Sequence, residues 1–170
     1  MDEKKKQFET AYEEYAHGIL RHTYFRVKDK ETAEDIVQET FFKAWRSIVD
    51  EDLKEIKNIK AFLYKILNNT IIDYYRTKKE MLSLDQSIEG KENLIIEENT
   101  DEKRIDDEIE NLKLKKYLSE IKEEYREILI MKYVDDLRIS EISKITNKSQ
   151  TNTRVTIHRA LQTLKKKYEK

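Results

Sequence analysis

Apolar residues recur every three or four positions through the first 79 residues of the chain, the spacing of amphipathic α-helices. Stretches at about 33–48 and 59–79 carry continuous apolar faces, and an earlier stretch at about 8–26 carries a mainly aromatic one. The face positions are Ile36, Val37, Thr40, Phe41, Ala44 and Ile48; Ile59, Phe62, Leu63, Ile66, Leu67, Thr70 and Ile71; and Phe8, Tyr12, Tyr15, Ile19 and Tyr24. We predict three helices in residues 8–79 and find no convincing strand pattern.

The periodicity fails between residues 80 and 108, where acidic residues are dense and Gly90 interrupts the chain. Residues 80–110 hold 3 basic and 12 acidic side chains, too polar a mixture to offset the entropy of ordering. About 30 irregular residues would be unusual inside one compact domain. We therefore predict a flexible acidic linker at 80–108 between two all-helical domains at 8–79 and 109–170, with Leu94–Ile96 as a candidate docking point.

The last segment predicts a helix-turn-helix. Asn147 tolerates the left-handed turn conformation that separates two helices, and Ser149 is a good N-cap for the second one. The positions expected to face inward are Leu118, Ile121, Tyr125, Ile128 and Leu129; Ile139, Ile142 and Ile145; and Thr153, Ile157, Ala160, Leu161 and Leu164. Such a motif places its second helix in the major groove of DNA.

The outer face of the last helix suits nucleic acid. Its residues are Gln150, Thr151, Arg154, Val155, His158 and Gln162, with Asn152 and Arg159 beside them. Arginine can donate two bonds to guanine, and asparagine or glutamine can read adenine. Residues 111–170 hold 15 basic and 8 acidic side chains, the positive balance expected of a DNA-binding module. A helix-turn-helix alone does not separate repressors, activators and recombinases.

A second polar cluster lies in the stretch TAEDIVQETFFKAW. Thr32 and Asp35 have the spacing of a capping box, which would explain Asp35 structurally. Gln38 and Glu39 lie off the apolar face near Trp45, and the residues alone leave two interpretations open. The cluster is either a solvated charged face or a contact site for arginines of a partner, with the indole as an anchor.

Composition narrows the function classes. The chain contains no cysteine, which removes disulfides and thiolate metal sites, and no proline. Its start lacks the apolar core of a signal peptide, and no apolar run approaches the length of a membrane span. His17, His22 and His158 do not form a metal cluster with suitable carboxylates. We expect a soluble, intracellular protein with no cofactor, no metal site and no catalytic residues, which is not an enzyme.

Three stretches together resemble the bacterial RNA polymerase sigma factors, closest to the extracytoplasmic-function (ECF) group of the sigma-70 family. They are TAEDIVQETFFKAWRSI, AFLYKILNNTIIDYYRTKK and EEYREILIMKYVDDLRISEISKITNKSQTNTRVTIHRALQTLKKK. The resemblance implies a two-domain helical protein that binds core RNA polymerase and promoter DNA in the cytoplasm. It also implies an anti-sigma factor as regulator, no membrane insertion and a monomeric free state.

The resemblance assigns site residues by position. Polymerase binding, through the clamp-helix coiled coil of the largest subunit, falls on Asp35, Gln38 and Glu39, with Trp45 at a further contact. The −10 element falls on Asn69, Asp73 and Arg76, and the loop at about 52–60 corresponds to the part that captures a flipped base. The −35 element falls on Arg154, His158 and Arg159, with Gln150 and Asn152 nearby. Stacking on unpaired bases requires aromatic faces, for which Tyr64, Tyr74 and Tyr75 are candidates.

The sequence departs from the family pattern at several turn and helix positions. Lys122 stands where proline is frequent, and Asp136 and Asn147 stand where glycine is frequent. In the last helix Thr153 replaces an aliphatic residue, and Val155–Thr156 replaces a common Ser–Arg pair. Family −35 preferences therefore do not transfer directly. The alternative is a stand-alone helix-turn-helix regulator that dimerises through its N-terminal helices, binds DNA by itself and has no affinity for polymerase.

Overall fold

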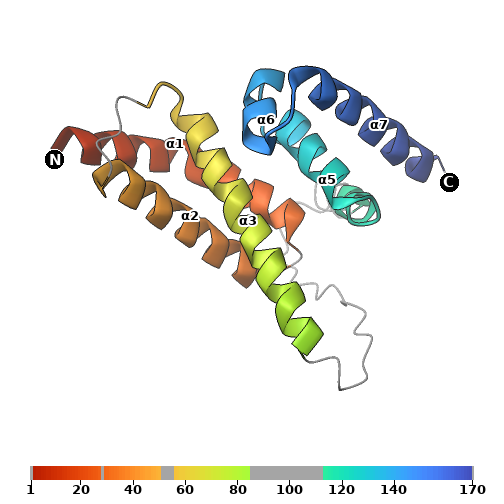
Figure 1. Cartoon of the computed structure of the whole chain (residues 1–170), viewed down its shortest axis with the longest axis horizontal. Helices are drawn as coiled ribbons and strands as arrows, with labels where there is room; N and C mark the ends of the chain where they lie inside the picture. The colour runs from red at the N-terminus through yellow and green to blue at the C-terminus, as the bar shows by residue number, and fades with distance from the viewer. Residues whose placement is uncertain (1, 28, 51–55, 85–112, 170) are drawn as a thin grey trace, which may run out of the picture.

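The structure is a computed structural model that describes residues 2–27, 29–50, 56–84 and 113–169 (Figure 1). Within these ranges the chain is helical and contains no strand. The elements are α1 (Asp2–Arg26), α2 (Lys30–Asp50), α3 (Ile59–Leu84), a helical stretch at 113–119, α5 (Glu123–Leu129), the π-helical turn η1 (Ile130–Val134), α6 (Ile139–Thr146) and α7 (Gln150–Tyr168). The predicted all-α architecture of two helical modules is confirmed.

The N-terminal module is formed by α1, α2 and α3, which pack on one another along their lengths. The predicted faces of α2 and α3 are confirmed, because every position on them is buried or partly buried. Ile36, Leu63, Leu67 and Ile71 are almost completely removed from solvent. Each such aliphatic side chain stabilises the fold by about 1.5–3 kcal/mol.

The predicted aromatic face of α1 is partly wrong. Tyr12 and Tyr24 are 50% and 40% exposed, whereas His22, Thr23 and Arg26 are buried on the inward side of the helix. Polar groups are tolerated at these inward positions because a second module, rather than solvent or an apolar core, covers that end of α1.

The expected capping box of α2 is also wrong. The helix begins at Lys30, and the Asp29 carboxylate accepts from the Thr32 amide at 2.8 Å and from the Thr32 hydroxyl at 2.6 Å. The bond from the Thr32 hydroxyl, followed by that from its amide, lowers the pKa of Asp29. Asp29 therefore caps the helix, and Asp35 has no capping role.

The C-terminal module contains the predicted helix-turn-helix. Asn147 ends α6 in the left-handed conformation, with φ 57° and ψ 40°, and Asp136 also has a positive φ of 52°. The Asn152 amide donates to Ser149 Oγ at 3.1 Å, which confirms the predicted cap of α7. Leu161 is the exception among the inward positions of α7, because it is 38% exposed.

The boundary between the modules differs from the sequence estimate. Helix α3 continues to Leu84, so residues 80–84 of the expected linker are helical and exposed. The remainder of the expected linker, including the Leu94–Ile96 docking point, lies outside the described residues. None of the described helices is long and apolar enough to cross a membrane.

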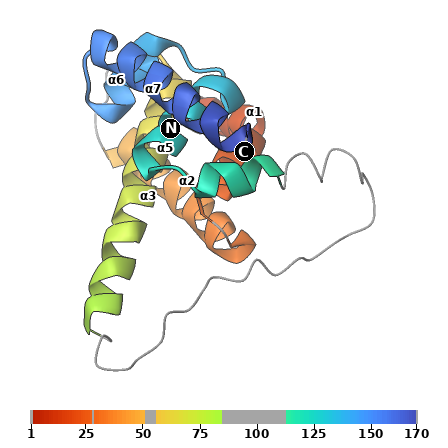
Figure 2. The same ribbon diagram turned by 90° about the vertical axis from the view of Figure 1, so that its right-hand side faces the viewer.

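The two modules lie side by side (Figures 1 and 2). Helix α6 packs on the N-terminal part of α3, and η1 packs on the C-terminal part of α1. This arrangement leaves α2 on the far side of the N-terminal module from α5, α6 and α7 (Figure 1).

Candidate nucleic-acid and protein interfaces

A groove of about 330 Å³ runs between α2 and α3. Its lining residues are Thr32, Asp35, Ile36 and Glu39 from α2, and Thr70, Asp73, Tyr74 and Thr77 from α3. The groove therefore joins two sets of residues that the sequence analysis assigned to different tasks. Asp35 and Glu39, expected at polymerase, share one acidic depression with Asp73 and Tyr74, expected at the −10 element.

The acidic side chains of α2 are available to a partner. Asp35, Gln38 and Glu39 are all exposed, and within the described residues the Asp35 carboxylate makes no hydrogen bond or ion pair. Glu39 pairs with Lys43 at 2.8 Å, and the same ammonium group donates to Thr70 Oγ1 at 3.4 Å. Exposed ion pairs of this kind contribute little to stability, so an arginine of a partner can replace Lys43 at low cost.

Trp45 occupies a different part of α2. Its ring centroid lies 5.1 Å from that of Phe8, and the side chain is partly buried between α1 and α2. The indole therefore helps to hold these two helices together, and it does not line the groove that contains Asp35 and Glu39.

The α3 residues expected at the −10 element lie on the outer part of the helix. Asn69 is exposed, and Arg76 Nη2 lies 2.8 Å from Asp73 Oδ1. The Lys78 ammonium group lies 5.8 Å from the centroid of the Tyr74 ring. Asp73 and Tyr74, which line the groove, thus each have a cation beside them.

Only one of the three candidate tyrosines is positioned for stacking on a base. Tyr64 is 3% exposed and its hydroxyl donates to Asp135 Oδ1 at 3.2 Å. Tyr75 donates to the carbonyl of Arg26 at 2.5 Å. Both rings therefore have structural roles, whereas Tyr74 lines the open groove.

The loop assigned to base capture is described only from residue 56. Asn58 caps α3, because its side-chain oxygen accepts from the Ala61 amide at 2.9 Å. Its side-chain nitrogen also donates to Glu141 of the C-terminal module at 2.7 Å, and Lys60 donates to the Asp135 carbonyl at 2.8 Å. Residues 52–55 lie outside the described part of the chain.

Helix α7 presents the predicted outer face. Its exposed residues are Gln150, Thr151, Asn152, Arg154, Val155, His158, Arg159 and Gln162. Thr156 is 6% exposed and its hydroxyl donates to the Asn152 carbonyl at 2.8 Å, so this position lies inside the module. The substitution of a basic residue by Thr156 is thus a packing difference as well as the loss of a charge.

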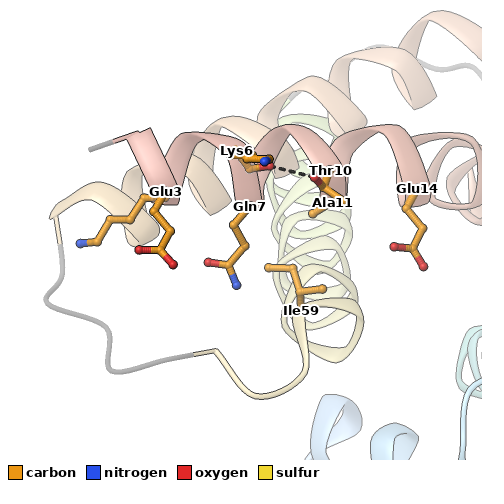
Figure 3. A pocket seen from close by; sticks show the side chains of 8 residues that line it. Glu3, Lys6, Gln7, Thr10, Ala11, Glu14 and Ile59 are labelled. Atoms are coloured by element: carbon orange, nitrogen blue, oxygen red, sulfur yellow. Dashed lines mark hydrogen bonds between the residues drawn. The ribbon is translucent and has the colours of Figure 1, made fainter.

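Two other grooves contain none of the expected site residues except Ile59, at the end of the loop assigned to base capture. One of about 690 Å³ runs along the N-terminal half of α1 beside Ile59, between mixed charges such as Glu3, Lys6 and Glu14 (Figure 3). The other, of about 590 Å³, lies between the helical stretch 113–119 and the end of α7. Among the described residues no group of three or more His, Cys, Asp or Glu side chains could hold a metal ion.

Sequence reasoning missed the buried polar residues that join the modules. His22 and Arg26 continue the inward stripe that begins at Ile19, spaced three and four residues apart. That spacing could have predicted that His22 and Arg26 are buried. We assigned the stripe to Tyr24 instead because aromatic residues are expected on buried faces more often than charged ones.

The fold and these surfaces define a class of protein: an all-α, two-module transcription factor with a helix-turn-helix and a separate acidic contact surface. Family models for sigma-70 region 2 and sigma-70 region 4 match residues 11–80 and 111–164. The chain is 31% identical over 159 residues to the ECF RNA polymerase sigma factor SigM of Bacillus subtilis (strain 168), covering 94% of this chain and 93% of SigM. It is 30% identical to the RNA polymerase sigma factor SigV of the same organism, covering 95% and 94% of the two chains.

A solved structure has the same fold. The sigma factor RpoE from Bartonella quintana, in complex with the anti-sigma factor NepR, matches with a TM-score of 0.73 at 19% identity, covering 95% of this chain and 96% of that one. The chain belongs to the ECF group of sigma-70 RNA polymerase sigma factors. It binds core RNA polymerase and directs promoter recognition at the start of transcription. The stand-alone regulator is therefore the wrong alternative.

Proposed function

We propose that the acidic face of α2 is where this sigma factor binds core polymerase. Asp35, Gln38 and Glu39 are exposed on consecutive turns, and Asp35 lacks the capping role that would otherwise explain it. The carboxylates of Asp35 and Glu39 can accept charge-assisted bonds from arginines of the clamp helices. Trp45 supports this surface by holding α2 against α1 through Phe8.

We propose that the two modules divide promoter recognition, with residues 8–79 at the −10 element and residues 109–170 at the −35 element. Asn69, Asp73, Tyr74 and Arg76 face one side of α3, and the loop at 52–60 captures a flipped base. Arg154, His158 and Arg159 read or hold the −35 duplex, with Gln150 and Asn152 beside them. The exposure of all of these α7 side chains supports the assignment.

The protein acts through binding, without bond chemistry of its own, and in the cytoplasm, because its polymerase partner works there. An anti-sigma factor holds it inactive before induction. The RpoE fold neighbour, which is bound to an anti-sigma factor, supports this proposal. Affinity purification from uninduced cells should recover such a partner, and recovery of polymerase subunits alone would contradict it.

The proposal for α2 is tested by capturing core polymerase with the purified protein. The variant Asp35→Ala/Gln38→Ala/Glu39→Ala should lose retention of polymerase by about tenfold or more, as expected when a central charged contact is truncated. The matched control is Glu34→Ala, which removes an exposed acid from the same helix. Equal retention of polymerase by the triple variant and the control would contradict the proposal that this face of α2 binds polymerase.

A further inference from the structure

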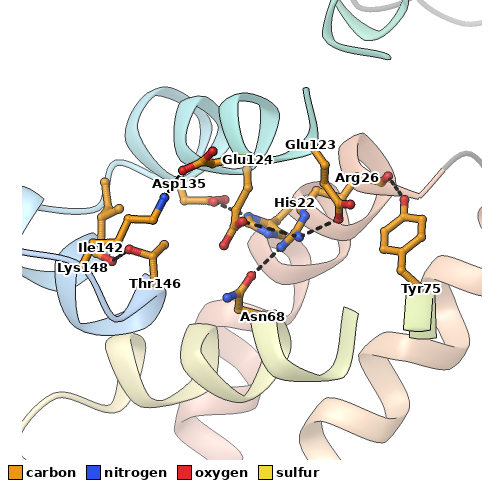
Figure 4. Close-up of polar contacts among 11 residues, drawn as sticks. His22, Arg26, Asn68, Tyr75, Glu123, Glu124, Asp135, Ile142, Thr146 and Lys148 are labelled. Atoms are coloured by element: carbon orange, nitrogen blue, oxygen red, sulfur yellow. Dashed lines mark hydrogen bonds and ion pairs between the residues drawn. The ribbon is translucent and has the colours of Figure 1, made fainter. Parts of the chain in front are cut away.

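Helix α3 keeps one long side exposed within the described part of the chain. On one flank, Asn68 accepts a hydrogen bond from the Arg26 guanidinium at 2.7 Å, and the Tyr75 hydroxyl donates to the Arg26 carbonyl at 2.5 Å (Figure 4). On the other flank, Asp73 and Tyr74 line the groove with α2. Between the flanks lies a row of exposed residues spaced three and four apart, which we call the outer stripe: Lys65, Asn69, Ile72, Arg76 and Lys79.

Most of the outer stripe has the composition of a surface for nucleic acid. Lys65, Arg76 and Lys79 supply cations for phosphate groups. Asn69 supplies a side-chain amide of the kind that pairs with adenine. From its first to its last residue the stripe is about 21 Å long at about 1.5 Å per residue, which matches about six nucleotides at a rise of about 3.4 Å.

The outer stripe adjoins the groove between α2 and α3. Arg76 Nη2 lies 2.8 Å from Oδ1 of Asp73, which lines that groove. Both side chains of this ion pair are exposed, so a phosphate can replace the carboxylate as partner of Arg76 at low cost. A DNA strand that follows the stripe therefore also reaches the edge of the groove.

Ile72 is the one apolar member of the outer stripe, and it is 46% exposed. The other large apolar side chains of α3 that are exposed lie in its last turn, at Met81, Leu82 and Leu84. Isoleucine has a lower helix propensity than lysine, arginine or glutamate. The exposed part of Ile72 thus contributes neither to packing nor to helix propensity, and it is available to an apolar group of a ligand.

Thymine is the DNA base that offers such a group. Its C5-methyl is the only methyl group on the four bases, and apolar side chains distinguish thymine through it. Ile72 lies three residues after Asn69 and four residues before Arg76, so it has an amide on one side and a guanidinium on the other. A thymine methyl group against Ile72 would leave the neighbouring base and phosphate within reach of polar partners.

We propose that Ile72 is a specificity-determining residue, which selects thymine in the −10 element by covering its C5-methyl group. Lys65 and Lys79 bind phosphates of the same strand. The inference rests on the proposed assignment of residues 8–79 to the −10 element, and it adds Lys65, Ile72 and Lys79 to the contacts proposed there.

The experiment removes the methyl group from the DNA and its partner from the protein. Promoter fragments are first selected with the holoenzyme from a pool randomised over the −10 element, and thymine should be enriched at one position or more. Each enriched thymine is then replaced by deoxyuridine, which pairs identically and lacks only the C5-methyl group. Competition between the two fragments gives the ratio of their affinities within one protein, so any loss of folded material in a variant cancels.

The parent holoenzyme should prefer thymine to deoxyuridine by about fourfold at one −10 position, the contribution of one methyl group removed from water. Ile72→Ala should lower this ratio to about one, and Ile72→Val should retain most of it. Met81→Ala truncates an exposed apolar side chain at the end of α3 and should keep the parent ratio. Selection without thymine, a parent ratio of one, an unchanged ratio in Ile72→Ala or an equal loss in Met81→Ala would overturn the role of Ile72.

The two lysines are tested by the salt dependence of binding. Lys65→Ala/Lys79→Ala should weaken all fragments by a similar factor and lower the slope of log affinity against log salt by about 1 to 2. Lys5→Ala/Lys6→Ala, which removes two exposed lysines from α1, is the matched control. Equal slopes for the two double variants would contradict phosphate contacts along the stripe.

Asn69→Ala separates this inference from the assignment of the −10 element itself. It should alter the response to full base substitutions in the −10 element and leave the thymine-to-deoxyuridine ratio near that of the parent. A response in Asn69→Ala together with an unchanged ratio in Ile72→Ala would overturn only the role of Ile72. No response to any −10 base in either variant would overturn the assignment of residues 8–79 to this element.

Discussion

Two adjacent tyrosines of α3 have different roles, because Tyr74 lines the α2–α3 groove and Tyr75 does not. Tyr74 and Tyr75 are adjacent, with ring centroids 5.4 Å apart, but within the described part of the chain only the Tyr75 hydroxyl is bonded, to the carbonyl of Arg26. Burial raises the pKa of Tyr75, a tendency strengthened by the nearby Glu123 carboxylate. The two tyrosines should therefore respond differently to substitution.

Tyr74→Ala should impair promoter opening by the holoenzyme, since base stacking contributes about 1–3 kcal/mol per base. Permanganate footprinting of the opened strand measures this effect, and Tyr74→Phe should retain it. The control, Tyr75→Phe, should instead lower the free energy of unfolding by about 1 kcal/mol through the lost hydrogen bond. Normal opening by Tyr74→Ala would exclude stacking at this position.

Arg154→Ala should weaken binding of the holoenzyme to its selected promoter by about 1–3 kcal/mol, the energy of a bidentate contact with guanine. The effect should be confined to promoters with the preferred −35 base, as measured by competition with single-base variants. Lys144→Ala, which removes an exposed charge from α6, is the control. A uniform loss across all sequences would indicate that Arg154 holds a phosphate instead.

At the scale of the element, the helix-turn-helix depends on a helix cap and a left-handed turn residue, both of which the sequence predicted. Ser149→Ala removes the acceptor of the Asn152 amide and should cost about 1 kcal/mol. Asn147→Ala should cost about 1 kcal/mol, because alanine is disfavoured in the left-handed conformation that ends α6. Urea unfolding followed by circular dichroism checks both, with Lys144→Ala as a helical control. Stabilities equal to that of the control would contradict these roles.

Glu141 links an element to the whole molecule. It caps α6 by accepting from the Arg138 amide at 2.7 Å and it accepts from Asn58 of the other module. Partial burial alone would raise the pKa of Glu141, but the Arg138 amide and the Asn58 side chain hold it below its ordinary value.

A carboxylate whose folded pKa is depressed stabilises the fold above its unfolded pKa, and this contribution is lost as the pH falls through the folded pKa. Thermal stability should therefore decline below about pH 4.5, and the decline should be shallower in Glu141→Gln. Melting temperatures from pH 7 to pH 3 test this, with Glu124→Gln as a control that changes a different carboxylate of the C-terminal module. Identical pH profiles for Glu141→Gln and the parent protein would show that ionisation of Glu141 does not contribute to the pH dependence of stability.

At the scale of the whole molecule, the sequence determined the helices, the split into two modules and the exposed polar side of α7. These features depend on residues that are close together in the sequence, so they can be predicted without the fold. They are the helical period, the Asn147–Ser149 turn and the excess of basic residues in 111–170. Family resemblance further supplied the positions of the expected contacts. None of these properties depends on which surfaces meet when the chain closes.

Tertiary structure alone decided what lies across each surface. Asp29 rather than Thr32 caps α2, because the choice between neighbouring capping residues depends on where the chain turns. Asp35 and Asp73 share a groove because α2 and α3 pack side by side. His22 and Arg26 are buried because Asp135 and Glu123, about a hundred residues later in the chain, supply partners for them. A buried charge is recognisable only when its partner is known, and pairing over such a separation is a property of the fold.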